Sequence, residues 1–109
     1  MRVNALIEHI LIVDDDEVDR MSCVRLLRDS KFAKCQLLEV KTGQEALDQC
    51  ATQLPDCILL DYNLPDMNGF EFVDKLVTLN NGDYVALILL TGQGDEFLAA
   101  GSLKHSLDD

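Results

Sequence analysis

Positive charge, tryptophan and proline are scarce in this 109-residue chain, which has nine lysines and arginines, no tryptophan and two prolines. Against 20 acidic residues, the nine basic ones leave a formal net charge of −11, which repels nucleic acid. No apolar run approaches the roughly 18 residues of a membrane helix, and Arg2, Glu8 and His9 interrupt the stretch where a signal peptide would stand. We therefore expect a cytoplasmic protein that binds neither nucleic acid nor membrane.

The cysteines show no disulfide or zinc pattern. No C-x-x-C pair occurs, and no histidine stands close enough in the sequence to suggest a zinc site. Each cysteine lies among apolar residues, which predicts buried free thiols in a reducing compartment. The four are Cys23, Cys35, Cys50 and Cys57.

Length and composition predict one domain over residues 1–109. With 48% hydrophobic and 27% charged residues, the chain can bury a core of ordinary size. Short apolar runs alternate with segments of helical periodicity, which is typical of a parallel sheet with crossover helices. Strands are predicted over 9–13, 35–40, 57–60 and 84–90.

The segments between these strands carry helix signals. Over residues 17–30 four apolar residues recur every three positions, namely Val18, Met21, Val24 and Leu27. Thr42 and Glu45 have the spacing of a capping box, which predicts a second helix after Thr42. Further helices are predicted from Gly69 and over residues 95–103.

Polar residues follow three of the predicted strands directly: Asp14 with Asp15, then Asp61, then Thr91. Sites in open parallel sheets lie at these strand ends. Neighbouring carboxylates repel one another unless a cation lies among them, and Mg²⁺ is the hard divalent ion that suits oxygen ligands. With the ion bound, an aspartate can attack phosphorus and the Thr91 hydroxyl can hydrogen-bond the phosphoryl oxygens.

Each of these residues also has a simpler interpretation. Asp14, Asp15 or Asp16 can cap the first helix, and Thr91 can cap the helix that follows it. Asp61 can be a turn residue before Pro65. A cap explains one aspartate, whereas the chain places three in a row and a fourth after another strand.

Three blocks of sequence resemble the receiver domain of two-component response regulators, including the chemotaxis regulators. They are I-L-I-V-D-D at 10–15, P-D-C-I-L-L-D-Y-N-L-P-D-M-N-G-F at 55–70, and L-I-L-L-T-G at 87–92. The resemblance covers the chain from about His9 onward. It implies an α/β fold of the flavodoxin-like class, with a doubly wound parallel sheet.

The resemblance implies a phosphoacceptor switch. Asp61 would take a phosphoryl group from a histidine kinase or a phosphotransfer protein. Asp14, Asp15, Asp61 and the main-chain carbonyl of Asn63 would hold Mg²⁺, and Thr91 would be the switch hydroxyl. Such a domain is not a turnover enzyme, and at most phosphorylates itself from small donors and dephosphorylates itself.

The sequence departs from the family at its end. It stops at Asp109, before the family's fifth strand, fifth helix and phosphoryl-binding lysine, and is interpreted as a C-terminally truncated domain. The expected sheet then has the order 2-1-3-4 with Tyr84–Leu90 as an exposed edge. Such an edge predicts a homodimer or strand exchange. The missing lysine predicts weakened phosphorylation of Asp61.

Two other functions remain as alternatives. The run at 14–18 also resembles the D-x-D-x-[TV] opening of haloacid-dehalogenase-type phosphatases, with Asp14 as nucleophile and Asp16 as acid/base. Thr91, Lys104 and the final two aspartates would complete that site, but Asp61 would have no role. The other alternative is an interaction module that binds a partner without phosphate.

Overall fold

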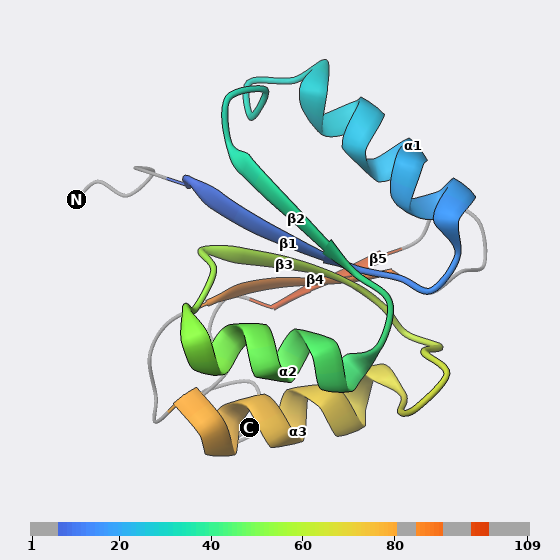
Figure 1. Ribbon diagram of the computed structural model, residues 1–109, viewed down its shortest axis with the longest axis vertical. Helices are drawn as coiled ribbons and strands as arrows, with labels where there is room; N and C mark the ends of the chain where they lie inside the picture. The colour runs from blue at the N-terminus through green and yellow to red at the C-terminus, as the bar shows by residue number, and fades with distance from the viewer. Residues whose placement is uncertain (1–6, 81–84, 91–96, 101–109) are drawn as a thin grey trace.

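The computed structural model describes residues 7–80, 85–90 and 97–100. A central sheet has α1 on one face and both α2 and α3 on the other, as Figure 1 shows. The elements in chain order are β1 (His9–Val13), α1 (Glu17–Arg28), β2 (Gln36–Val40), α2 (Gly43–Thr52), β3 (Cys57–Asp61), α3 (Gly69–Asn80), β4 (Ala86–Leu90) and β5 (Phe97–Ala100).

The sheet has the order β2-β1-β3-β4-β5, and its first four strands are parallel. β1 is an interior strand, because Val13 pairs with Val40 of β2 on one side and with Leu60 of β3 on the other. The order 2-1-3-4 and the helices on both faces confirm the predicted flavodoxin-like fold.

The prediction for the end of the sheet is wrong. A fifth strand is present: residues 97–100, expected within a helix, form β5 and pair antiparallel with β4. Unpaired N–H and C=O groups along the apolar β4 edge favour pairing, and this gain outweighs the helical preference of the leucine and alanines in Phe-Leu-Ala-Ala. Tyr84 and the rest of the expected helix lie outside the described residues.

β5 also removes the basis for the expected self-association. The predicted edge Tyr84–Leu90 contains β4, which has β3 on one side and β5 on the other. Its backbone groups from Leu87 to Leu90 lie opposite residues of β5. A homodimer or strand exchange through an exposed β4 edge is therefore not supported.

Two apolar layers hold the sheet between its helices. Leu11 and Val13 belong to the larger layer beneath α2 and α3, while Ile10 and Ile12 belong to the layer beneath α1. This alternation places β1 in both layers, which explains why its sequence is apolar at successive positions. Phe72 of α3 is the largest fully buried side chain of the described residues.

The helices begin where side chains cap them. Thr42 accepts a hydrogen bond from the Glu45 N–H at 3.0 Å, which confirms the predicted start of α2. α3 has a reciprocal pair, since Asn68 and Glu71 each accept from the other's N–H, at 2.9 and 2.8 Å. α1 has acidic residues in its first turn and basic residues, Arg25 and Arg28, in its last.

The four cysteines are free thiols, as predicted, but only two of them are buried. Cys50 and Cys57 lie in the core, and burial raises the pKa of each to about 11. Cys23 and Cys35 are half-buried. Within the ranges that the structure describes, no helix is long and apolar enough to cross a membrane.

We expect Phe72→Ala to lower the free energy of unfolding by about 3–5 kcal/mol, because it leaves a cavity in the larger layer. Phe70, two residues earlier, is 62% exposed and makes an edge-to-face contact with Tyr62. Phe70→Ala is the matched control, with an expected loss below about 1.5 kcal/mol. Urea denaturation followed by circular dichroism measures both, and equal losses would contradict the described packing.

Candidate functional site

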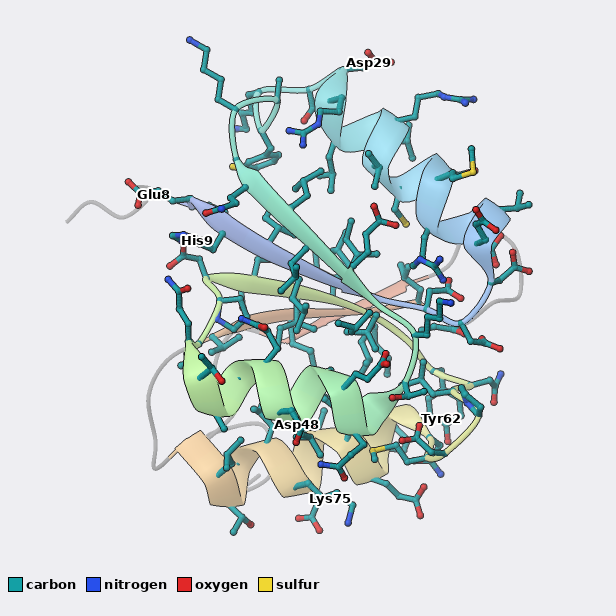
Figure 2. All side chains as sticks on the ribbon, viewed as in Figure 1. Glu8, His9, Asp29, Asp48, Tyr62 and Lys75 are labelled. Atoms are coloured by element: carbon teal, nitrogen blue, oxygen red, sulfur yellow. The ribbon has the colours of Figure 1, made fainter. Side chains whose placement is uncertain are left out.

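Three aspartates gather at the carboxyl end of the parallel strands. Asp14 and Asp15 follow β1, and Asp61 is the last residue of β3. Because Val13 pairs with Leu60, the next residue of each strand brings a carboxylate to the same place. One oxygen from each of the three lies within 4.8 Å of the others. Tyr62 marks this end of the sheet in Figure 2, and Glu8 and His9 mark the opposite end.

The three carboxylates differ in exposure. Asp14 is buried at 5% relative exposure, Asp61 is half-buried, and Asp15 is exposed. The cluster therefore has a buried side and a solvent-facing side. A ligand that arrives from solution meets Asp15 and Asp61 more readily than Asp14.

Burial and the charges of nearby acids raise the pKa values of two of the three aspartates, Asp14 and Asp61. Burial is the main cause that raises the pKa of Asp14 to about 6, and the charges of Asp61, Asp19 and Asp15 add to it. The pKa of Asp61 is raised by burial first and then by Asp15 and other nearby acids. Two backbone N–H groups act in the opposite direction, from Asp16 toward Asp14 and from Asn63 toward Asp61.

Asp16 is a helix cap and does not belong to the cluster. Its Oδ1 accepts from the N–H groups of Val18 at 2.8 Å and Asp19 at 3.2 Å. Its own N–H donates to Asp14 Oδ1 at 2.9 Å. The capping interpretation thus applies to the third aspartate of the run, and the first two are left for the cluster.

The loop that carries Asn63 is tied to α2. Both carboxylate oxygens of Asp66 accept from the start of that helix, from the Gly43 N–H and the Gln44 N–H, each at 2.9 Å. Burial is the largest single influence and raises the pKa of Asp66, but the backbone hydrogen bonds, including those from Gly43 and Gln44, together outweigh it and lower that pKa. Asn63 itself is exposed and bridges to Asn68. The loop between β3 and α3 therefore has a fixed shape directly beside the cluster.

Two glycines permit this close packing. A Cβ atom on Gly43 would lie 2.5 Å from the sulfur of Met67. A Cβ atom on Gly69 would lie 2.6 Å from Leu89 Cδ1 and 2.9 Å from Tyr62 Cδ1. A larger residue at either position would force these neighbouring side chains to shift.

The remaining predicted site residues lie outside the described residues. These are Thr91, Lys104, Asp108 and Asp109. The structure thus brings Asp14, Asp15 and Asp61 together, and Asn63 stands two residues after Asp61.

Arg20, a buried cation at 8% relative exposure, was not predicted from the sequence. Its Nη1 donates to the main-chain oxygen of Asp14 at 2.7 Å, and its Nε donates to Glu39 Oε1 at 3.2 Å. The spacing of residues along the helix was the signal that could have placed Arg20 on the inward face of α1. Val18 and Met21, assigned to the apolar face, are 68% and 51% exposed. The inward face is instead formed by Arg20, Cys23, Val24 and Leu27.

The sequence matches the response regulator receiver domain family over residues 10–109. It is 32% identical over 100 residues to the response regulator MprA of Mycolicibacterium vanbaalenii, with 92% of this chain and 41% of that protein covered. It is also 32% identical over 102 residues to the KDP operon transcriptional regulatory protein KdpE of Escherichia coli, with 93% and 42% covered. The chain spans less than half the length of these two curated relatives.

A solved structure agrees with these matches. The chemotaxis response regulator CheY4 of Vibrio cholerae superposes with a TM-score of 0.70 at 28% sequence identity, with 83% of this chain and 72% of that chain covered. The match extends the sequence similarity to the arrangement of strands and helices. The chain belongs to the response regulator receiver domain family.

Proposed function

We propose that this chain takes a phosphoryl group on Asp61, with Mg²⁺ held by Asp14, Asp15, Asp61 and the main-chain carbonyl of Asn63. The observation that carries the proposal is the gathering of three carboxylates within 4.8 Å at the ends of β1 and β3. Carboxylates so close repel one another, and a hard divalent cation with oxygen ligands relieves that repulsion. When bound, Mg²⁺ supplies positive charge to the oxygens of an incoming phosphoryl group.

Exposure favours Asp61 over Asp14 as the nucleophile. Asp61 is half-buried and reaches solvent, whereas the Asp14 carboxylate is buried and accepts a hydrogen bond from the Asp16 N–H. In the phosphatase alternative Asp14 attacks and Asp16 transfers a proton. Asp16 instead caps α1. The phosphatase alternative also gives Asp61 no role in the reaction.

The phosphoryl donor we propose is a phosphohistidine of a histidine kinase or a phosphotransfer protein. An Asp61 oxygen forms a bond to phosphorus as the phosphorus–nitrogen bond breaks, and the histidine nitrogen keeps the electron pair. The chain then acts as a switch in the cytoplasm, with Thr91 as the hydroxyl that responds to the phosphoryl group. Small phosphate donors and water support only slow self-phosphorylation and dephosphorylation.

The first test is the intact mass of the chain after incubation with Mg²⁺ and acetyl phosphate. We expect one phosphoryl adduct on the unaltered chain and none on Asp61→Asn, because the amide is not a nucleophile toward phosphorus. Asp16→Asn is the matched control: it retains a capping oxygen, lies outside the cluster and keeps the adduct. An adduct that persists in Asp61→Asn but disappears in Asp14→Asn would favour the phosphatase alternative.

Absence of an adduct from every variant would favour the interaction module. Mg²⁺ titration then separates the two remaining cases. If the unaltered chain binds Mg²⁺ and Asp15→Asn does not, the metal site is supported and only the phosphoryl transfer is rejected. If the unaltered chain does not bind Mg²⁺, the metal site is rejected as well.

Without metal, the buried Asp14 carboxylate costs stability, and the cost depends on pH. The unfolded aspartate titrates near its ordinary pKa of 3.8, whereas folding raises the pKa of Asp14 to about 6. The cost is therefore absent below about pH 4, grows as pH rises, and is complete above about pH 6. In EDTA at pH 7.5 we expect Asp14→Asn to raise the free energy of unfolding by about 1–3 kcal/mol.

The same pair of proteins provides the control for this prediction. At pH 4 the unaltered chain is protonated at Asp14, so the difference between the two unfolding free energies should nearly vanish. Urea denaturation at both pH values measures it. A variant less stable than the unaltered chain at pH 7.5 would contradict the assigned cost.

A further inference from the structure

We propose that Arg20 is a positioning residue that holds the peptide between Asp14 and Asp15 in the orientation that a divalent cation requires. The proposal rests on the proposed function, because it concerns the same metal site. Arg20 touches neither a carboxylate of the cluster nor the reacting atoms in the described hydrogen bonds. Its effect passes through the backbone.

The hydrogen bond from Arg20 to the main chain affects two proposed metal ligands, Asp14 and Asp15, at once. The oxygen that accepts from Arg20 Nη1, at 2.7 Å, belongs to the peptide that joins Asp14 to Asp15. The plane of this peptide determines the direction in which both side chains leave the backbone. On the other side of Asp14, its N–H donates to the Val40 oxygen at 3.1 Å. β2 and α1 thus each hydrogen-bond to the main chain of Asp14.

The guanidinium is itself held in place. Its Nε donates to Glu39 Oε1 at 3.2 Å, and Glu39 lies opposite Ile12 in the pairing of β2 with β1. The arginine side chain is 10% exposed and the glutamate side chain 43% exposed. A planar group with fixed donors can satisfy a carboxylate and a carbonyl together, which the single ammonium of lysine does less well.

Two roles can be considered for Arg20, a nearby positive charge or a positioning residue, and they predict opposite effects on Mg²⁺ affinity when Arg20 is replaced. The side chains that raise the pKa of Asp14 by their charge are all acidic: Asp15, Asp19 and Asp61. If Arg20 acted only as a nearby positive charge, its removal would make the cluster attract Mg²⁺ more strongly. If it positions the peptide, its removal weakens Mg²⁺ binding. The sign of the change therefore distinguishes the two roles.

The experiment is a calorimetric titration of Mg²⁺ into the unaltered chain, Arg20→Met, Arg20→Lys and Arg28→Met. Arg28 is the matched control, because it lies on the same helix and its Nη1 donates to the main-chain oxygens of Ala33 at 2.7 Å and Cys35 at 3.1 Å. We expect Kd for Mg²⁺ to rise about fivefold or more in Arg20→Met. Arg20→Lys should recover part of the affinity. Arg28→Met should leave Kd within about twofold.

A second pair of variants keeps the proposal falsifiable if Arg20→Met does not fold. Glu39→Gln and Glu39→Ala remove the same charge, but only glutamine retains an oxygen that accepts from Arg20 Nε. Positioning predicts weaker Mg²⁺ binding in Glu39→Ala than in Glu39→Gln. Equal Kd values in this pair would overturn the proposal.

The outcomes separate this proposal from the proposed function. If the unaltered chain does not bind Mg²⁺, the metal site fails, and the role of Arg20 fails with it. If the unaltered chain binds Mg²⁺ and Arg20→Met binds it equally or more tightly, only the role of Arg20 is overturned. Loss of affinity in Arg28→Met to the same extent would also overturn it, because the effect would then be general destabilisation.

Discussion

The parallel pairing of β1 with β3 is the constraint on which the rest of the site depends. With Val13 opposite Leu60, the carboxylates of Asp14 and Asp61 must meet at one edge of the sheet. A slip of one residue would move the apolar side chains of β1 into the wrong layers, so the core enforces the register. The burial energy of the two layers thus maintains a cluster of like charges that would not assemble alone.

Much of this arrangement could be predicted from the sequence, because apolar runs that end in aspartate define both a strand and its chemistry. Asp14, Asp15 and Asp61 were found in this way, and the structure brings their carboxylates together. The inward face of α1 was found only in part. Val24 and Leu27 pack inward as predicted, but Val18 and Met21 are exposed, and the buried arginine carries no apolar signal. β5 was missed because its strand form depends on the neighbouring edge of β4.

The hydrogen bonds of Asp66 were also beyond sequence analysis, for a different reason. Its partners, Gly43 and Gln44, stand more than 20 residues earlier in the chain, and only the folded sheet brings the loop and the helix together. Local patterns reveal caps that lie within a few residues of their helix, such as Thr42 with Glu45. The parts that position a site come from several elements, so they are the least visible in the sequence.

The separation of charge along α1 has a consequence for how the molecule meets other molecules. A helix rises about 1.5 Å per residue, so the two ends of this 12-residue helix lie roughly 17 Å apart. Acids surround its start, whereas Arg25 and Arg28, with Lys31 and Lys34 in the following loop, place positive charge at the other end. Although Asp29 caps that end, the charges along α1 and the loop after it therefore form an electric dipole. A charged partner is turned by this field before contact, and the rate of encounter falls as salt screens it.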